Sequence, residues 1–448
     1  MPKKKTALTI EERLQQALVP AEEQPYEVPK NWVWVRLESV ASWGSGGTPS
    51  RKHEEYYNGD ILWIKTGELN NGWIYDTEEK ITDEGLKKSS AKLFPPYSVL
   101  IAMYGATIGK VAILGVPATT NQACACAVCN QSLLYMYLFY YCISQKNVFI
   151  EKGKGGAQPN ISQIILKQHP IPLPPLSEQQ RIVERIEELF AKLDEAKERL
   201  QEVADSFAVR KAAILHKAFT GELIGKQVTE LVPLENLVDL IKIGPFGSSL
   251  HESDYIENGI PLVNPKHIVQ QRIVPQSKIS ISDEKAEELS SYKLKENDIV
   301  LGRRGEMGRC APISNREENW ICGTGSMIIR LKKEYDAKLY SLILGSQATV
   351  TYLENSAVGS TLKNLNEKIV RKIPVPQFSN EEQHEIVRLI DDLLARERSA
   401  QQAAEQALAS IELMKKSILA RAFRGELGTN KASEASALEL LRQVLAEG

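Results

Sequence analysis

The sequence lacks an excess of one charge, a dense set of cysteines and a long apolar stretch. Its 448 residues carry 55 Lys and Arg against 57 Asp and Glu, which excludes a uniformly basic nucleic-acid-binding protein. Six cysteines are too few for a disulfide framework in a chain of this length. The longest apolar run, around residues 133–143, is too short to span a bilayer, and the N-terminal segment has no signal-peptide core. We therefore expect a soluble, cytoplasmic protein that makes no membrane contact.

Signatures of catalysis and of cofactor binding are also missing. Residues 105–111 resemble a phosphate-binding loop, but one spacer is absent and Val111 replaces the Ser or Thr that would hold magnesium. Residues 264–267 begin like the Asn-Pro-Pro-aromatic motif of amino-methyltransferases, without its second proline or its aromatic residue. The cysteines at 124–129 alternate in a run typical of a buried strand, and no second ligand pair follows at zinc-site spacing. We predict no catalytic residue, no metal site and no bound cofactor in this chain.

The sequence does contain an internal repeat, which defines its organisation. Residues 178–223 align without a gap with residues 382–427. Both copies follow an Ile-Pro-x-Pro motif and end in Ala-Phe-x-Gly-Glu-Leu. A weaker repeat precedes each copy, in which residues 98–101 match 298–301. The chain therefore consists of two halves, each with a variable segment followed by a helical one.

The repeated segments predict two long helices that pack against each other. Their apolar residues alternate spacings of four and three, the heptad pattern that buries one stripe against a partner helix, and only Glu397 interrupts the second stripe. We expect an antiparallel pair within one chain, because the chain supplies both partners; dimerisation of the protein through these helices is the alternative. At 1.5 Å per residue, each helix would form a rod of about 60 Å. The predicted packing positions are Ile182, Ile186, Leu189, Leu193, Leu200, Phe207, Ile386, Ile390, Leu393, Ala404, Ile411 and Ile418.

The variable segments predict two α+β domains with small mixed or antiparallel sheets. Short β-type runs, such as 99–104 and 326–331, are separated by Gly, Pro, Asn and Ser clusters, and each segment ends in a helical stretch. The predicted fold therefore has two α+β domains separated by two long antiparallel coiled-coil helices, with a pseudo-twofold internal repeat. The predicted boundaries are an N-terminal segment (1–24), a first domain (25–176), a first spacer helix (177–221), a second domain (222–378), a second spacer helix (379–425) and a C-terminal tail (426–448).

Amphipathic segments lie towards both ends of the chain, near residues 8–19 and 435–446. Each has apolar residues at helical spacing and needs a surface to cover them. They could pack on each other or on a partner subunit, and a frayed tail is the alternative; the sequence favours none of these arrangements.

Gly-rich loops in the two predicted domains share a frame and differ in their side chains. Residues 302–309 contain three arginines, and the matching residues 102–110 keep the glycines and one cation but little else. Arginine can engage guanine edges or phosphates, and glycine lets a backbone approach closely. Domains that read different DNA sequences would show this combination; exposed polar turns are the alternative. Two further pairs of matching segments offer amide and cationic groups: 63–67 with 262–266, and 153–161 with 358–365.

In the order and duplication of these motifs, the chain resembles the specificity subunit of type I restriction–modification systems. The resemblance covers about residues 25–427 and rests on Gly-Gly-Thr-Pro-Ser at 46–50, Trp-Ile-Lys-Thr-Gly-Glu-Leu at 63–69 and the two repeated helices. It implies two target recognition domains, each reading one half of a split, asymmetric DNA site, with the helices setting the gap. It also implies a non-catalytic subunit that binds double-stranded DNA, two adenine methyltransferase subunits and restriction–translocase subunits. S-adenosylmethionine, ATP and magnesium would be bound by those partners.

The resemblance carries over loop positions rather than base contacts, because the second domain departs from the first. Residues 244–249 read Gly-Pro-Phe-Gly-Ser-Ser, and Trp-Ile-Lys-Thr-Gly is not kept at 262–266. A coiled-coil scaffold that binds no DNA is the alternative function. The candidate DNA-binding residues of the first domain are Thr48, Ser50, Lys65, Thr66, Tyr104, Thr107, Lys110, Lys154 and Gln158. Those of the second domain are Ser248, Ser249, Asn264, Lys266, Arg303, Arg304, Arg309 and Lys363.

Overall fold

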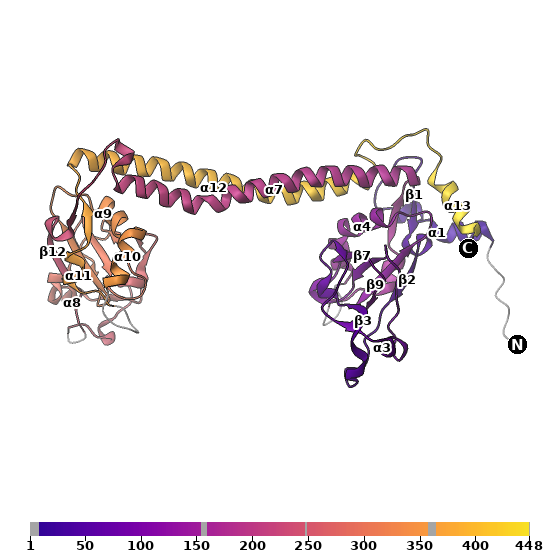
Figure 1. Ribbon diagram of the computed structural model, residues 1–448, viewed down its shortest axis with the longest axis horizontal. Helices are drawn as coiled ribbons and strands as arrows, with labels where there is room; N and C mark the ends of the chain where they lie inside the picture. The colour runs from indigo at the N-terminus through magenta and orange to yellow at the C-terminus, as the bar shows by residue number, and fades with distance from the viewer. Residues whose placement is uncertain (1–8, 154–158, 247–248, 357–363, 448) are drawn as a thin grey trace. The chain divides into compact units, whose positions relative to one another are not determined.

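The computed structural model describes residues 9–153, 159–246, 249–356 and 364–447. The chain folds into two compact units: the residues up to Arg199 together with those from Ala407 onward, and Leu200–Gln406. Each unit holds one α+β domain and a part of both long helices, α7 (Leu176–Phe219) and α12 (Asn380–Ala422) (Figure 1). Among the described residues, no helix is long and apolar enough to cross a membrane.

The strands of the first unit's domain form two sheets. They are β2 (Ala41–Ser45), β3 (Tyr57–Ile64), β4 (Trp73–Ile74), β5 (Lys80–Ile81), β6 (Val99–Ala102), β7 (Val111–Leu114), β8 (Thr119–Thr120) and β9 (Cys124–Cys129). The larger sheet has the order β2-β9-β6-β7-β4, and its central strands are buried at every residue of β6 and β7. The smaller sheet, β5-β3-β8, packs on it through Leu62 and Ile64. The cysteine-rich run thus forms a strand of the larger sheet, as its alternation predicted.

The second unit's domain repeats this topology. Its strands are β12 (Val238–Ile243), β13 (Ile260–Val263), β14 (Ile268–Val269), β15 (Arg272–Ile273), β16 (Ser280–Ile281), β17 (Asp298–Gly302), β18 (Cys310–Pro312), β19 (Ile321–Cys322) and β20 (Ser326–Leu331). The order β12-β20-β17-β18 corresponds to β2-β9-β6-β7, and β16-β13-β19 corresponds to β5-β3-β8. The pairs β3–β8 and β13–β19 are both parallel. This correspondence confirms the predicted α+β fold with an internal repeat.

Two further strand pairs and a set of short helices complete the units. The Ile-Pro-x-Pro motifs form strands that pair antiparallel with an earlier strand, where a missing proline N–H leaves no central ladder bond unmade. These pairs are β1 (Val33–Arg36) with β10 (Pro170–Leu173), and β11 (Leu231–Pro233) with β21 (Pro374–Pro376). The short helices are α1 (Ile10–Ala17), α2 (Leu37–Val40), α3 (Asp83–Lys87), α4 (Tyr135–Ser144), α5 (Lys146–Lys152), α6 (Gln163–Lys167), α8 (Asp283–Glu288), α9 (Ala337–Leu344), α10 (Gln347–Ser356), α11 (Glu367–Arg371) and α13 (Ala437–Glu447).

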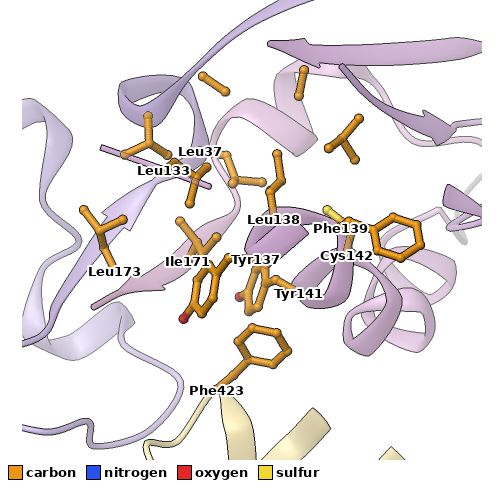
Figure 2. Close-up of a cluster of buried hydrophobic side chains, with 14 of the residues drawn as sticks. Leu37, Leu133, Tyr137, Leu138, Phe139, Tyr141, Cys142, Ile171, Leu173 and Phe423 are labelled. Atoms are coloured by element: carbon orange, nitrogen blue, oxygen red, sulfur yellow. The ribbon is translucent and has the colours of Figure 1, made fainter. Parts of the chain in front are cut away.

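An aromatic contact joins the first unit's domain to its long helices. Figure 2 shows Phe423, which follows α12, against two tyrosines of α4; its ring centroid lies 5.2 Å from that of Tyr137 and 5.0 Å from that of Tyr141. The buried hydroxyls of these tyrosines donate to the carbonyl oxygens of Pro172 and Pro170 in β10, at 2.8 and 2.5 Å. Because both polar tips are satisfied, the rings can lie inside the core. Helix α4 is thereby fixed to β10 and to the end of α12.

Within each unit, α7 and α12 lie side by side, and their ends enter the core of the domain. Ile182 and Ile186 belong to the first unit's core, and Ile386 and Ile390 belong to the second unit's core. The remaining predicted packing positions divide by burial: Phe207, Ala404 and Ile411 are buried, whereas Leu189, Leu193, Leu200, Leu393 and Ile418 are partly buried.

Ion pairs between the helices show that they run antiparallel. In the first unit, Lys415 pairs with Asp194 at 2.5 Å and Glu412 pairs with Lys197 at 2.8 Å, so one numbering falls as the other rises. In the second unit, Glu397 accepts from Nε of Arg210 at 3.0 Å. The residue that interrupts the apolar stripe therefore has a partner on the other helix. Exposed pairs of this kind contribute about 1 kcal/mol or less each, so they favour a register more than they add stability.

A buried glutamine near the start of α7 connects this helix to the first unit's domain. The side-chain oxygen of Gln179 accepts from the backbone N–H of Leu134 at 2.9 Å. Its amide nitrogen donates to the carbonyl oxygens of Ser132 and Pro174, at 2.9 and 3.0 Å. The residue before α4 is thereby held by a side chain of α7.

The same contact recurs near the start of α12. Gln383 accepts from the backbone N–H of Asp336 at 2.8 Å and donates to the carbonyl oxygens of Glu334 and Phe378, at 2.9 and 3.1 Å. Asp336 precedes α9 as Leu134 precedes α4. Both glutamines are almost fully buried, at 0% and 1% exposure. An identical set of donors and acceptors therefore sets the position of each domain on its helix.

The described terminal segments pack on each other, which is one of the arrangements that the sequence left open. Helix α1 lies beside α13 (Figure 1), with Glu11 paired to Arg442 at 3.1 Å. The backbone N–H of Ala437 donates to the carbonyl oxygen of Asn31 at 2.9 Å. Ala437 and Leu441 are fully buried in the first unit's core. The C-terminal segment is therefore an integral part of the first unit.

Replacing Gln383 by alanine should lower the stability of the second unit by about 2–4 kcal/mol. The change leaves one buried N–H and two buried carbonyl oxygens without their partner. Thermal unfolding of the full chain would measure the loss of stability. Hydrogen exchange at the amide of Asp336, measured separately on the folded protein, would show whether this N–H has lost its protection. Gln401→Ala, on an exposed position of the same helix, is the control and should change stability by about 0.5 kcal/mol or less. Equal losses in the two variants would contradict the role given to Gln383.

Candidate nucleic-acid interface

At one end of the first unit's domain, backbone hydrogen bonds hold three segments against the loop between β8 and β9. This loop bonds to the segments that carry Thr48, Lys65 and Tyr104, three of the predicted positions. Those positions therefore lie at one end of the domain, which we call the loop end of the first unit. The three backbone hydrogen bonds, each 2.9 Å long, run from Gly47 N–H to Thr120 O, from Asn121 N–H to Ile64 O and from Met103 N–H to Ala123 O.

In the second unit, the loop between β19 and β20 holds neighbouring segments together in the same way. We call this end of the domain the loop end of the second unit. The loop bonds to the segments that carry Asn264, Arg303 and Arg304. The corresponding bonds run from Gly323 N–H to Val263 O at 3.0 Å, from Arg303 N–H to Gly325 O at 2.9 Å and from Gly244 N–H to Ser326 O at 2.9 Å. The two units therefore present equivalent loops on equivalent scaffolds.

A glycine is required where each incoming segment crosses this loop. A Cβ atom on Gly46 would lie 1.8 Å from the carbonyl oxygen of Thr120, and one on Gly244 would lie 2.0 Å from that of Gly323. No side chain fits at such distances, so both positions need glycine for close approach. This explains why Gly-Gly-Thr-Pro-Ser and Gly-Pro-Phe-Gly-Ser-Ser keep their first glycine and differ after it.

Tyr104 and Arg304 occupy equivalent exposed positions. Each follows the central strand of its sheet and forms an isolated bridge, Tyr104 with Asn160 and Arg304 with Asn364. A glycine in the left-handed conformation comes next in both turns, with φ of 61° at Gly105 and 83° at Gly305. Both side chains are exposed, Tyr104 by 43%. The backbone thus displays a phenol in one unit and a guanidinium in the other at the same place.

At the first loop end, one glutamate, Glu79, pairs with two cationic side chains, Lys65 and Arg51. Glu79 accepts from Lys65 at 2.9 Å and pairs with Arg51 at 2.7 Å. This hydrogen bond, which Lys65 donates to Glu79, raises the pKa of Lys65 and lowers the pKa of Glu79. The guanidinium of Arg51 also lies 4.3 Å from the ring centroid of Tyr57. Sequence reasoning missed Arg51, whose only signal was its place directly after the Gly-Gly-Thr-Pro-Ser motif.

The other predicted positions of the first loop end are mostly hydroxyl groups in local hydrogen bonds. Thr48 donates to the side-chain oxygen of Gln122 at 2.5 Å, and Thr107 donates to the carbonyl oxygen of Tyr104 at 2.8 Å. Gln122 is exposed on the loop between β8 and β9, and the sequence analysis did not predict it as a site residue. The remaining predicted residues are exposed or half-buried: Ser50, Thr66 and Lys110.

Two of the three arginines in the second loop end are held by the protein itself. Arg303 is 5% exposed, and its Nε donates to the carbonyl oxygen of Leu365 at 3.1 Å. Burial lowers the pKa of Arg303, and the charge of Arg304 adds to this effect. Arg309 pairs with Glu306 and donates to the carbonyl oxygen of Pro265 at 3.3 Å. Arg304 is therefore the arginine of this loop that is presented to solvent.

The other second-unit candidates lie around this arginine's loop. Asn264 is half-buried below Gly323, whereas Lys266 and Ser249 are exposed. In the described part of the chain, no group of three or more His, Cys, Asp and Glu side chains could hold a metal ion. Four candidates lie outside the described residues: Lys154, Gln158, Ser248 and Lys363.

Comparison with known proteins places this duplicated scaffold in a family. The model of the type I restriction modification DNA specificity domain matches residues 29–205 and 235–407. The EcoBI specificity subunit of Escherichia coli is 25% identical over 461 residues, which cover 93% of this chain and 92% of that protein. The MjaIX specificity subunit of Methanocaldococcus jannaschii is 29% identical over 298 residues, which cover 62% and 68%.

Solved structures share the fold. The crystal structure of the HsdS subunit from Thermoanaerobacter tengcongensis matches with a TM-score of 0.61 and 20% identity, covering 90% of this chain and 99% of that chain. A chain from a structural study of complex assembly and conformational transition of the type I R-M system matches with a TM-score of 0.64 and 20% identity, covering 90% and 100%. At this level of identity, the likeness concerns the fold alone.

The two neighbouring arginines should respond differently to substitution. Arg303→Ala should destabilise the second unit by about 2–3 kcal/mol, because the carbonyl oxygen of Leu365 loses a charged donor and a buried side chain is removed. Arg304→Ala should change stability by about 0.5 kcal/mol or less, since its side chain is exposed. Thermal unfolding of the two variants would show the difference, and equal midpoints would contradict the assignment of Arg303 to the scaffold.

Proposed function

The chain belongs to the type I restriction–modification DNA specificity family, and we propose that it selects the DNA site at which a restriction–modification complex acts. Each loop end reads one half of a bipartite, asymmetric sequence in double-stranded DNA. The observation that carries this proposal is the pair of equivalent exposed positions, Tyr104 and Arg304, on one repeated backbone. A common frame with different side chains is what two different half-sites require.

The exposed residues at the loop ends divide into two roles. Arg304 has a free guanidinium fork that suits a guanine edge, and the phenol of Tyr104 offers one donor and one acceptor. Lys110 and Lys266 suit phosphate contacts, which position the protein without reading sequence. Thr48, Ser50, Ser249 and Asn264 add hydroxyl and amide groups to the same surfaces. Lys65, Arg303 and Arg309 stabilise the loops and do not contact bases, because acidic or carbonyl groups of the chain already bind them.

The long helices provide the spacing between the half-sites. They contain 44 and 43 residues and pair antiparallel within each unit. A span fixed by two paired helices excludes half-sites at other separations, and simultaneous engagement of both halves multiplies specificity.

Chemistry is left to partner subunits. The chain recruits two adenine methyltransferase subunits and restriction–translocase subunits, which bind S-adenosylmethionine, ATP and magnesium. Its net charge of −2 gives the chain little general attraction for DNA, so these partners complete the grip on the duplex.

Sequencing of host DNA for N6-methyladenine tests the proposal directly. With the wild-type gene we expect a split motif that disappears when the gene is deleted. Arg304→Ala should relax one half of the motif only, and Tyr104→Ala should relax the other half only. Loss of one good base contact corresponds to about 5- to 150-fold weaker discrimination at that position.

Arg316→Ala is the matched control. Arg316 is exposed on the connection from β18 to β19, at the end of the sheet opposite the loop end, and its loss should leave the motif unchanged. A methylation pattern that does not depend on the gene, in cells with an active partner methyltransferase, would favour the DNA-independent scaffold instead.

A further inference from the structure

Four aromatic side chains form a cluster on the first unit's domain that the proposed DNA reading does not use. We call it the Trp73 cluster; it contains Trp73 in β4, Tyr75, Tyr97 and Tyr135 at the start of α4. The ring centroid of Trp73 lies 6.1 Å from those of Tyr75 and Tyr97 and 5.9 Å from that of Tyr135. Tyr97 precedes β6, whereas Tyr104 follows it, so the cluster lies away from the loop end.

The cluster is exposed although it consists of large rings. The exposed fractions are 38% for Trp73, 63% for Tyr75 and 56% for Tyr97. Contiguous exposed aromatic surface of this kind marks sites of interaction in soluble proteins. Tyrosine and tryptophan are also the residues that most often anchor a protein partner.

The backbone of Tyr97, which carries one ring of the cluster, is strained. The backbone of Tyr97 has φ of +67°, a left-handed conformation that residues other than Gly, Asn and Asp seldom adopt. Its counterpart Asn297 has the same φ and uses its amide to bond the backbone of Tyr335 and Ala337, both at 2.9 Å. Tyrosine forgoes these bonds. Strain retained without a local structural gain is typical of functional positions.

The second unit has no equivalent of the cluster. Strand β15 pairs with β14, but it has the burial pattern of β4 and lies beside β18 as β4 lies beside β7. Arg272 therefore stands in place of Trp73 and Val274 in place of Tyr75. Asn297 and Ala337 replace Tyr97 and Tyr135. The cluster therefore breaks the internal repeat, and any partner that it binds is bound by the first unit alone.

The electrostatic surroundings favour a cation. Glu187, on α7, acts on one member of the cluster: burial raises the pKa of Tyr135, and the charges of Tyr97, Glu187 and Tyr75 add to the shift. In the part of the chain that the structure describes, no lysine or arginine lies over any of the four rings. Elsewhere a cation of the chain does lie over a half-buried ring, as Arg51 does over Tyr57 and Lys415 does over Phe190. Negative π faces beside a carboxylate attract cations and repel phosphate.

We propose that the Trp73 cluster is a docking surface for a lysine or arginine side chain of one methyltransferase subunit. This inference rests on the proposed function, which brings two such subunits to the chain. A protein segment fits better than DNA, because the surface lies away from the loop end and the charge of Glu187 acts on it. The two methyltransferase copies are then held unequally, the copy on the first unit more tightly.

Titration of the full chain with purified methyltransferase subunit, followed by native mass spectrometry, resolves the two binding steps. Trp73→Leu with Tyr75→Leu keeps apolar area and removes two π faces, and should weaken one step by tenfold or more while leaving the other unchanged. Trp73→Phe keeps a π face and should bind like the wild type. Arg272→Leu with Val274→Leu, the matched change in the second unit, should leave both steps unchanged.

The outcomes separate this inference from the function on which it rests. If the wild type binds two methyltransferase copies and the leucine variant binds both equally well, the inference is wrong and the proposed function stands. If the leucine variant instead loses affinity for DNA in the absence of methyltransferase, the surface binds nucleic acid and the inference is again wrong. If the wild type binds no methyltransferase, the proposed recruitment fails and the docking surface fails with it.

Discussion

The side-chain amide of a buried glutamine is the contact on which the arrangement of each unit depends. Gln179 and Gln383, both in long helices, each satisfy one N–H and one carbonyl at the entry to α4 or α9, and a second carbonyl just before their own helix. Those short helices cover the sheet whose strands end in the loop end. The direction in which a loop end faces is therefore set by a neutral, buried amide, whose hydrogen bonds do not change with pH or salt.

The sequence was sufficient to predict the larger organisation. The repeat, the heptad stripes and the short β-type runs are periodic signals, and periodicity survives differences in detail. The antiparallel helix pair and the two similar α+β domains followed from them. The glutamine contact was repeated in the sequence too, but a glutamine in the first turn of a helix resembles any other polar residue there. Its role depends on tertiary partners about 45 positions away along the chain, which no local pattern reveals.

The candidate site was harder to predict because residue type does not determine exposure. Arg303, Arg304 and Arg309 are equivalent on paper, yet the chain's own carbonyl and carboxylate groups occupy two of them. Gln122 and Arg51 were missed for the converse reason: nothing in the sequence marks either side chain as part of the site. Gln122 becomes a neighbour of Thr48 through a hydrogen bond, and Arg51 becomes a neighbour of Lys65 because both pair with Glu79. Shared glycines indicate a frame, whereas contacts within the fold determine which side chains remain available.

The way the first unit is assembled from both ends of the chain has a consequence for its synthesis. The second unit is one continuous stretch, Leu200–Gln406, whereas the first needs residues from Ala407 onward to cover Tyr137 and Tyr141 with Phe423. At about 5–20 residues per second, the ribosome reaches that segment roughly 10–40 s after it has passed Arg199. The first domain waits during this interval with an uncovered aromatic core, while the second can already fold. A chain that stops before Phe423 therefore exposes this core to the proteases and chaperones that screen new proteins.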